Sequence, residues 1–124
     1  MNKKQIEFEE GKEKQRVNLL CLEVGRDLQI IISGGESHIG AIGLGICYDL
    51  DKAKANSSVI SVHGHKEDDL VKKAAYRLSK ALRRNVAVSA GIHYDDLTGD
   101  DISAILANVD RLIDRLIDVF KNCD

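Results

Sequence analysis

The chain has 124 residues, 44% of them hydrophobic and 31% charged, with a formal net charge of −2. This length and apolar content predict a single domain, residues 1–124, with a core of its own. The nearly balanced charge gives no support to the strongly basic surface that nucleic-acid binding usually needs, so no nucleic-acid partner is expected.

Three cysteines, Cys21, Cys47 and Cys123, are scattered along the chain without a CxxC spacing. An odd, scattered set argues against a disulfide framework and for a reducing compartment. The polar amino terminus leads to no apolar signal region, and no apolar run approaches the length that spans a membrane. We therefore expect a soluble, cytoplasmic chain with no membrane partner.

The first third of the chain is rich in β patterns. Residues 4–10 alternate apolar and polar side chains, which predicts a short edge strand. Residues 16–24 form a longer apolar run, and residues 28–33 form another one after Gly25. Two such runs around a tight turn that contains glycine predict a β-hairpin.

A strand with unequal faces is predicted over residues 38–47, after a turn at Gly34 and Gly35. One face is mostly small, with Ile39, Ala41, Gly43, Gly45 and Cys47 at alternate positions. Repeated glycine on one face of a strand indicates the close approach of a helix, another backbone or a ligand. A helix packed on the sheet is the favoured interpretation.

The next segment, residues 48–58, is polar and is interpreted as a turn. Its Asp49-x-Asp51 spacing is found in calcium loops, but the other positions of such a loop are missing. Residues 59–62 are a short apolar run and predict a buried strand.

Two helices are predicted in the second half of the chain. Residues 70–82 place their apolar side chains on one stripe, after an acidic turn at residues 67–69 that suits the helix dipole. A buried strand follows at residues 86–92. Residues 102–120 form the second helix, behind a capping box over residues 98–101.

This order, with strands first and then β-α-β-α, favours an α+β fold. We expect an antiparallel-rich β-sheet of about six strands, with the two helices packed on one face to give two layers.

All four histidines lie at predicted strand ends. His38 begins one strand, His63 and His65 follow another, and His93 closes the last one. If these ends converge, His63, His65 and His93 supply the three nitrogen ligands of a catalytic zinc site. Exposed histidines with capping or hydrogen-bonding roles are the commoner alternative, and no metal ligand is assigned.

The entrance to the first helix is a second candidate site. Gly64, His65 and Lys66 precede it, and free amides at a helix start suit an anion such as phosphate. The acidic residues 67–69 already use the helix dipole and repel phosphate, so a well-capped helix is an equally good interpretation. No GxGxxG or Walker motif occurs, and the cysteines and serines lack the context of a nucleophile, so no catalytic residue is assigned.

Three segments in this order resemble a known family: Ile32–Ala41 (ISGGESHIGA), Gly64–Glu67 (GHKE) and Ala90–Asp95 (AGIHYD). Together they are similar to the LpdD-like prenylated flavin chaperone domain, a family that also carries the name of a small gallate decarboxylase component. Small proteins with this domain are associated with UbiD-type aromatic acid decarboxylases. The resemblance runs from about residue 28 to the final helix, and it implies a fold similar to the proteasome assembly chaperones.

The resemblance implies a non-catalytic accessory protein and not an enzyme. Such a protein would bind prenylated flavin mononucleotide (prenylated FMN), or the UbiD-type decarboxylase that receives it, and assist maturation of that enzyme. The matching cofactor-binding positions are Gly35, His38, Gly40, Gly64, His65, Lys66, Gly91 and His93. A small-residue sheet face would accept the flat isoalloxazine, and histidines would contact its phosphate or its polar edge.

Two other functions remain open. A protein-interaction module of the proteasome assembly chaperone type is the alternative, and a metal-dependent hydrolase that uses His63, His65 and His93 is the third. A homodimer is expected, because the domain is small and its sheet edges, such as residues 6–10, need cover.

Overall fold

A computed structural model describes residues 5–62 and 67–122 of the chain. Within these ranges the elements are, in chain order, β1 (Gln5–Glu10), a short 3-10 helix η1 (Glu13–Gln15), β2 (Val17–Val24), β3 (Asp27–Gly35), β4 (Ala41–Asp49), β5 (Lys54–Ser61), α1 (Asp68–Leu82), β6 (Val86–His93) and α2 (Gly99–Lys121).

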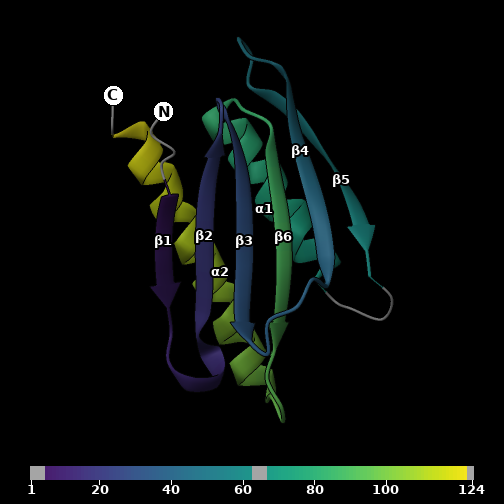
Figure 1. Ribbon diagram of the computed structural model, residues 1–124, viewed down its shortest axis with the longest axis vertical. Coiled ribbons are helices and arrows are strands. Elements are labelled where there is room, and N and C mark those ends of the chain that lie inside the picture. The colour runs from purple at the N-terminus through teal and green to yellow at the C-terminus, as the bar shows by residue number, and fades with distance from the viewer. Residues whose placement is uncertain (1–4, 63–66, 123–124) are drawn as a thin grey trace.

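The six strands form one sheet in the order β1-β2-β3-β6-β4-β5. Neighbouring strands are antiparallel, except that β3 and β6 are parallel. β2 and β3 form the predicted hairpin, in which Val24 pairs with Asp27. Because β6 lies between β3 and β4, the connection from β3 to β4 has to cross the end of β6 (Figure 1).

Both helices pack on the same face of the sheet, as the sequence predicts (Figure 1). α1 covers β4, β5 and β6, and α2 lies across β1 and β2. The predicted α+β fold of two layers is therefore confirmed. The largest fully buried side chains are apolar and include Leu19, Ile30, Ile32, Leu78, Leu112, Ile113 and Leu116. In the described ranges, no helix is both long and apolar enough to cross a membrane.

The small-residue face of β4 receives α1, which confirms the favoured interpretation of that face. A side chain at Gly43 would collide with the backbone of Val71, and one at Gly45 would collide with the backbone of Ala75. The helix therefore approaches the strand more closely than any larger residue would permit. Since α1 fills this space, the small-residue face is not available to a flat flavin ring, and that expectation is wrong.

The capping box predicted at the start of α2 is present. The backbone N–H of Asp101 donates to the Thr98 hydroxyl oxygen at 3.0 Å, and the Thr98 N–H donates to the Asp101 carboxylate at 3.1 Å. The Gln15 side chain donates to the same carboxylate at 3.0 Å. The hydrogen bond from Gln15, followed by those from Thr98, lowers the pKa of Asp101 from its usual value of 3.8. These contacts fasten η1 to the start of α2.

Two predicted boundaries and one predicted burial between residues 38 and 62 are wrong. β4 begins at Ala41 and not at His38, because residues 36–40 are needed to cross β6. Residues 54–58, interpreted as a turn, belong to β5. Residues 59–61 of the run that was predicted to be buried lie on the edge strand β5, where the side chain of Ile60 is 74% exposed, and Val62 follows the strand and is also exposed. An edge strand with one face open to solvent accepts polar residues, so its sequence lacks the apolar pattern that predicts a strand.

Candidate ligand site at the end of the sheet

Two of the three sequence motifs meet at one end of the sheet. β3 and β6 are parallel neighbours, so their carboxyl ends lie at the same edge, and Gly35 at the end of β3 pairs with His93 at the end of β6. Residues 36–40 continue from β3 across this edge to β4 (Figure 1). In open sheets with parallel strands, the carboxyl ends of the strands are a usual place for ligands.

The crossing loop, residues 36–40, is held on β6 by backbone hydrogen bonds at both of its ends. The Glu36 N–H donates to the His93 carbonyl at 2.9 Å, and the Gly40 N–H donates to the Ala90 carbonyl at 2.8 Å. Between these anchors the loop passes over Gly91, where an added Cβ would overlap the carbonyl group of His38. The absence of a side chain at Gly91 is therefore what lets the loop, and His38 with it, lie against the strand.

His38 faces oxygen atoms on both sides of its ring. Its Nδ1 lies 3.1 Å from the Glu36 carbonyl oxygen, and its Nε2 lies 3.4 Å from Oε1 of Glu67. The Glu67 side chain is almost buried, and the same Oε1 accepts the Ile92 N–H at 3.4 Å. A Cβ at Gly40 would lie 2.6 Å from the other carboxylate oxygen of Glu67, so Gly40 leaves room for this carboxylate.

Glu67 is a site residue to which the sequence pattern assigns a different role. The acidic turn predicts that Glu67 complements the dipole of α1, but it makes no side-chain capping hydrogen bond and its carboxylate reaches His38 and β6 instead. Two features of the sequence indicated that Glu67 belongs to the site: its position in the GHKE motif and the glycine at position 40. The carboxylate joins the helix start to the crossing loop and to β6.

His93 is the exposed member of the site. Its Nε2 lies 3.2 Å from a carboxylate oxygen of Asp95, and roughly half of its side chain is exposed. His38 and His93 line the same depression, together with Glu36 and Ser37. This depression has a volume of about 310 Å³ and is open to solvent. The structure thus brings five predicted site residues together at this edge, namely Gly35, His38, Gly40, Gly91 and His93. Glu36 and Ser37, which were not predicted as site residues, line the depression beside the two histidines.

Tyr94 fixes the end of β3, which runs to Gly35, so the turn predicted at Gly34 and Gly35 is wrong. Its hydroxyl donates to the Arg16 carbonyl oxygen at 2.6 Å, and its ring lies against Gly34 and Gly35. Gly35 has a φ of +63°, a conformation that side-chain-bearing residues rarely adopt. Gly35 therefore meets two requirements at once, a left-handed backbone and close contact with Tyr94.

The GHKE motif and His63 fall largely outside the described residues. The predictions made for His63, Gly64, His65 and Lys66 therefore stay predictions, although Glu67 and Val62 on either side of them reach the site. The Val62 N–H donates to the Gly40 carbonyl at 2.9 Å. Within residues 5–62 and 67–122, no group of three or more His, Cys, Asp or Glu side chains has the geometry to hold a metal ion.

Cys21 lies in the core and does not have the character of a reactive thiol. Burial, together with the nearby Glu23 carboxylate, raises the pKa of Cys21 to about 12. A thiol with this pKa stays protonated at neutral pH and is a poor nucleophile.

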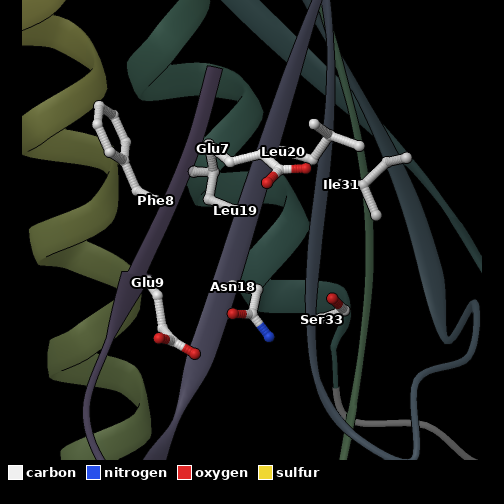
Figure 2. A pocket seen from close by; sticks show the side chains of 8 residues that line it. All are labelled: Glu7, Phe8, Glu9, Asn18, Leu19, Leu20, Ile31 and Ser33. Atoms are coloured by element: carbon white, nitrogen blue, oxygen red, sulfur yellow. The ribbon is translucent and has the colours of Figure 1, made fainter. Parts of the chain in front are cut away.

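A second hollow lies on the face of the sheet that the helices leave uncovered. It has a volume of about 520 Å³ and is lined by Glu7, Phe8, Glu9, Asn18, Leu19, Leu20, Ile31 and Ser33 (Figure 2). Ser33 pairs with Gly91, so one end of this hollow adjoins the strand over which the crossing loop passes. Glu7, Glu9 and Asn18 supply its acidic and amide side chains, and its apolar lining residues are Phe8, Leu19, Leu20 and Ile31 (Figure 2).

Comparison with known proteins supports the resemblance found in the sequence. Residues 11–121 match the family described as the prenylated flavin chaperone LpdD-like domain. The fold is similar to a chain in the crystal structure of a chaperone complex for yeast 20S proteasome assembly, with 16% sequence identity, a TM-score of 0.59 and 98% of each chain covered. At this identity the likeness concerns the fold alone. No curated protein matches the chain.

Proposed function

The chain belongs to the prenylated flavin chaperone LpdD-like family, and from this premise we propose that it binds prenylated FMN as a non-catalytic accessory protein of a UbiD-type aromatic acid decarboxylase. The observation that carries the proposal is the convergence of His38 and His93 on one open depression at the sheet end. Short motifs far apart in the sequence supply the two imidazoles and the glycines that bring them together.

The residues proposed to contact the flavin are those of the three motifs. In the described part these are Gly35, His38, Gly40, Gly91 and His93, and Gly64, His65 and Lys66 are included from the family resemblance. Gly40 and Gly91 support the site indirectly, because Gly40 leaves room for the Glu67 carboxylate and Gly91 lets the crossing loop, with His38, lie against β6. His93 is the imidazole most open to the ligand, since about half of its side chain is exposed and an imidazole ring has two nitrogens for hydrogen bonding. Both ring nitrogens of His38 face oxygen atoms of Glu36 and Glu67, so His38 would exchange one of these contacts for the ligand.

The charges around the depression favour the polar edge of the isoalloxazine over its phosphate. Glu36 lines the depression, and Glu67 and Asp95 lie beside the two imidazoles. Carboxylates accept hydrogen bonds from N–H and hydroxyl groups and repel phosphate. The described residues that line the depression include no lysine or arginine. We therefore propose that Lys66, in the GHKE motif, contacts the phosphate.

The openness of the depression suits a protein that hands its ligand on. Sites that retain a small molecule enclose most of its surface, in cavities of about 300–1,000 Å³. The depression is at the lower end of this range and is open to solvent, so a flavin bound there stays partly exposed to a receiving enzyme. We place this exchange in the cytoplasm, between a homodimer of this chain and the decarboxylase.

Removal of one imidazole is the first test of the flavin site. We expect His93→Ala to weaken prenylated FMN binding about tenfold, the effect of losing one hydrogen bond to a ligand. Isothermal titration calorimetry with purified protein and prenylated FMN, and with FMN as the second probe, measures this. The exposed location of His93 leaves the fold intact in this variant.

Tyr76→Ala provides the matched control. Tyr76 is an exposed aromatic residue on α1, at a distance from the site, and its removal leaves flavin affinity unchanged if binding is local. Failure of the wild-type chain to bind either flavin at high protein concentration contradicts the proposal. Equal losses in Tyr76→Ala and His93→Ala contradict the assignment of the site.

A protein-interaction module of the proteasome assembly chaperone type is the second candidate function. The observation that favours it is the likeness in fold to a chain of a proteasome assembly chaperone complex. Affinity purification from the native host separates the two functions. A co-purified decarboxylase supports the flavin role, and proteasome subunits support the alternative.

A further inference from the structure

Exposed apolar side chains gather on the face of the sheet that α1 and α2 leave uncovered, here called the open face. Strand pairing places them in rows across five strands. One row contains the apolar residues Leu20, Ile31, Ile42 and Ile60, with Ser89 between Ile31 and Ile42. The next row contains the apolar residues Leu22, Ala87 and Leu44, with Gln29 and Ser58 as its polar members. Leu20 and Ile31, labelled in Figure 2, alternate along their strands with the core residues Leu19, Ile30 and Ile32, which places them on the open face.

These side chains are more exposed than is usual for their type. Ile42 is 40% exposed, Leu44 is 43% exposed and Ile60 is 74% exposed, and Ile31 and Ile46 belong to the same set. Single apolar residues on a surface need no explanation, but a contiguous patch of this kind indicates an interaction site. The apolar patch is defined as Leu20, Leu22, Ile31, Ile42, Leu44, Ile46, Ile60 and Ala87.

We infer that a second copy of this chain docks on the open face, so that two sheets pack face to face about a two-fold axis. This interface specifies the homodimer included in the proposed function and does not depend on flavin binding. It also replaces the sheet edge at β1, which the sequence suggested, as the surface of contact.

The size of the face matches what a stable dimer needs. Six strands about 4.8 Å apart, each about eight residues long at about 3.3 Å per residue, give a face of roughly 760 Å². Standard protein interfaces bury about 800 Å² of accessible surface per partner. Because side chains make an accessible surface larger than its flat outline, one face covered by its copy reaches that standard.

The distribution of charge fits a self-complementary contact. Among the described residues of the open face, charged side chains lie at its borders, with Glu7 and Glu9 on β1 at one side and Lys54 at the end of β5 on the other. Glu9 is paired with Arg16 at 3.3 Å. An apolar centre with a polar rim is the usual anatomy of an interface. The centre of the patch carries no charged residue, so it needs no oppositely charged residue on its partner. The patch can therefore pack against the same patch of a second copy.

Sedimentation velocity over a concentration series tests the inference. The wild-type chain is expected at twice the 13.7 kDa mass of one copy. In Leu44→Glu each interface gains two buried carboxylates, one from each copy. We expect the dissociation constant of the dimer to rise about 100-fold or more. Ile60→Lys is the second variant. Because the Ile60 side chain is highly exposed in the single chain, the fold tolerates this substitution.

Leu106→Glu is the matched control, because Leu106 is a 50% exposed leucine on α2, away from the open face. It is expected to leave the dimer intact. A monomeric wild-type chain overturns the inference, and so does a dimer that survives both Leu44→Glu and Ile60→Lys. A monomer that binds a decarboxylase through Leu44 assigns the face to that enzyme and overturns it as well.

The same experiments separate this inference from the flavin proposal. A monomer that binds prenylated FMN contradicts the dimer alone. A dimer that is lost in Leu44→Glu, but that binds no flavin, supports the inference and contradicts the proposed function.

Discussion

Gly91→Ala is expected to reduce the free energy of unfolding by about 3 kcal/mol, the upper part of the range for inserting a methyl group into a packed site. The added Cβ would overlap the carbonyl group of His38, and the obstacle is backbone, which has no rotamer to change. The crossing loop must move away from β6, and His38 moves with it. Flavin affinity is therefore expected to fall in the same variant. Chemical denaturation followed by circular dichroism measures the loss of stability.

Gly99→Ala is the control for the chemical change itself. Gly99 begins α2, and an added Cβ there meets no other atom within 4 Å. The helix propensity of alanine predicts unchanged stability or a gain of about 0.5–1 kcal/mol. A Gly91→Ala variant as stable as Gly99→Ala would contradict the packing described for the crossing loop.

The second large effect is expected for Gly45→Ala, again a loss of about 3 kcal/mol by overpacking. The new methyl group would overlap the carbonyl oxygen of Ala75 and would lie 2.7 Å from the hydroxyl oxygen of Ser79. α1 would have to lift off β4, which weakens the packing of its buried side chains. Thermal unfolding of the variant measures the effect.

The two glycine variants differ in their effect on the site. Gly45 lies on the helix-covered face of β4, away from the crossing loop, so the fraction of Gly45→Ala protein that remains folded is expected to bind flavin normally. Gly91→Ala is expected to bind weakly even where it is folded. Equal flavin affinity in the folded fractions of both variants would contradict the role given to Gly91.

Much of the fold follows from local patterns. The two helices and the capping box are predicted correctly, because amphipathic spacing and cap residues act over a few positions. The unequal faces of β4 are also predicted correctly, since glycine at alternate positions leaves few options other than close packing.

The edge strand β5 could not be predicted in the same way. Its exposed positions include Lys54, Asn56 and Ser58, which are typical of a polar turn, and its apolar residue Ile60 is exposed. Burial produces the alternation on which strand prediction depends, and an edge strand with an open face has little of it. The exposure of Ile60 instead reflects the apolar patch, which only the sheet register reveals.

The candidate site depends on a fact that local patterns do not contain. β6, the last strand in the sequence, lies between β3 and β4, and this insertion forces residues 36–40 across Gly91. The motifs themselves are visible in the sequence, but whether they meet is not. Strand order determines that they do, and strand order is a long-range property. The contact of Glu67 with His38 follows from the same arrangement.

The central claim is that the flavin binds at the end of the sheet, on the crossing loop and the end of β6. Titration of ¹⁵N-labelled protein with prenylated FMN, followed by two-dimensional NMR, tests it most directly. We expect saturable shift changes that are largest at residues 35–40 and 91–95. Saturable binding that leaves these amides unchanged and shifts others, such as those of α2, would contradict the claim.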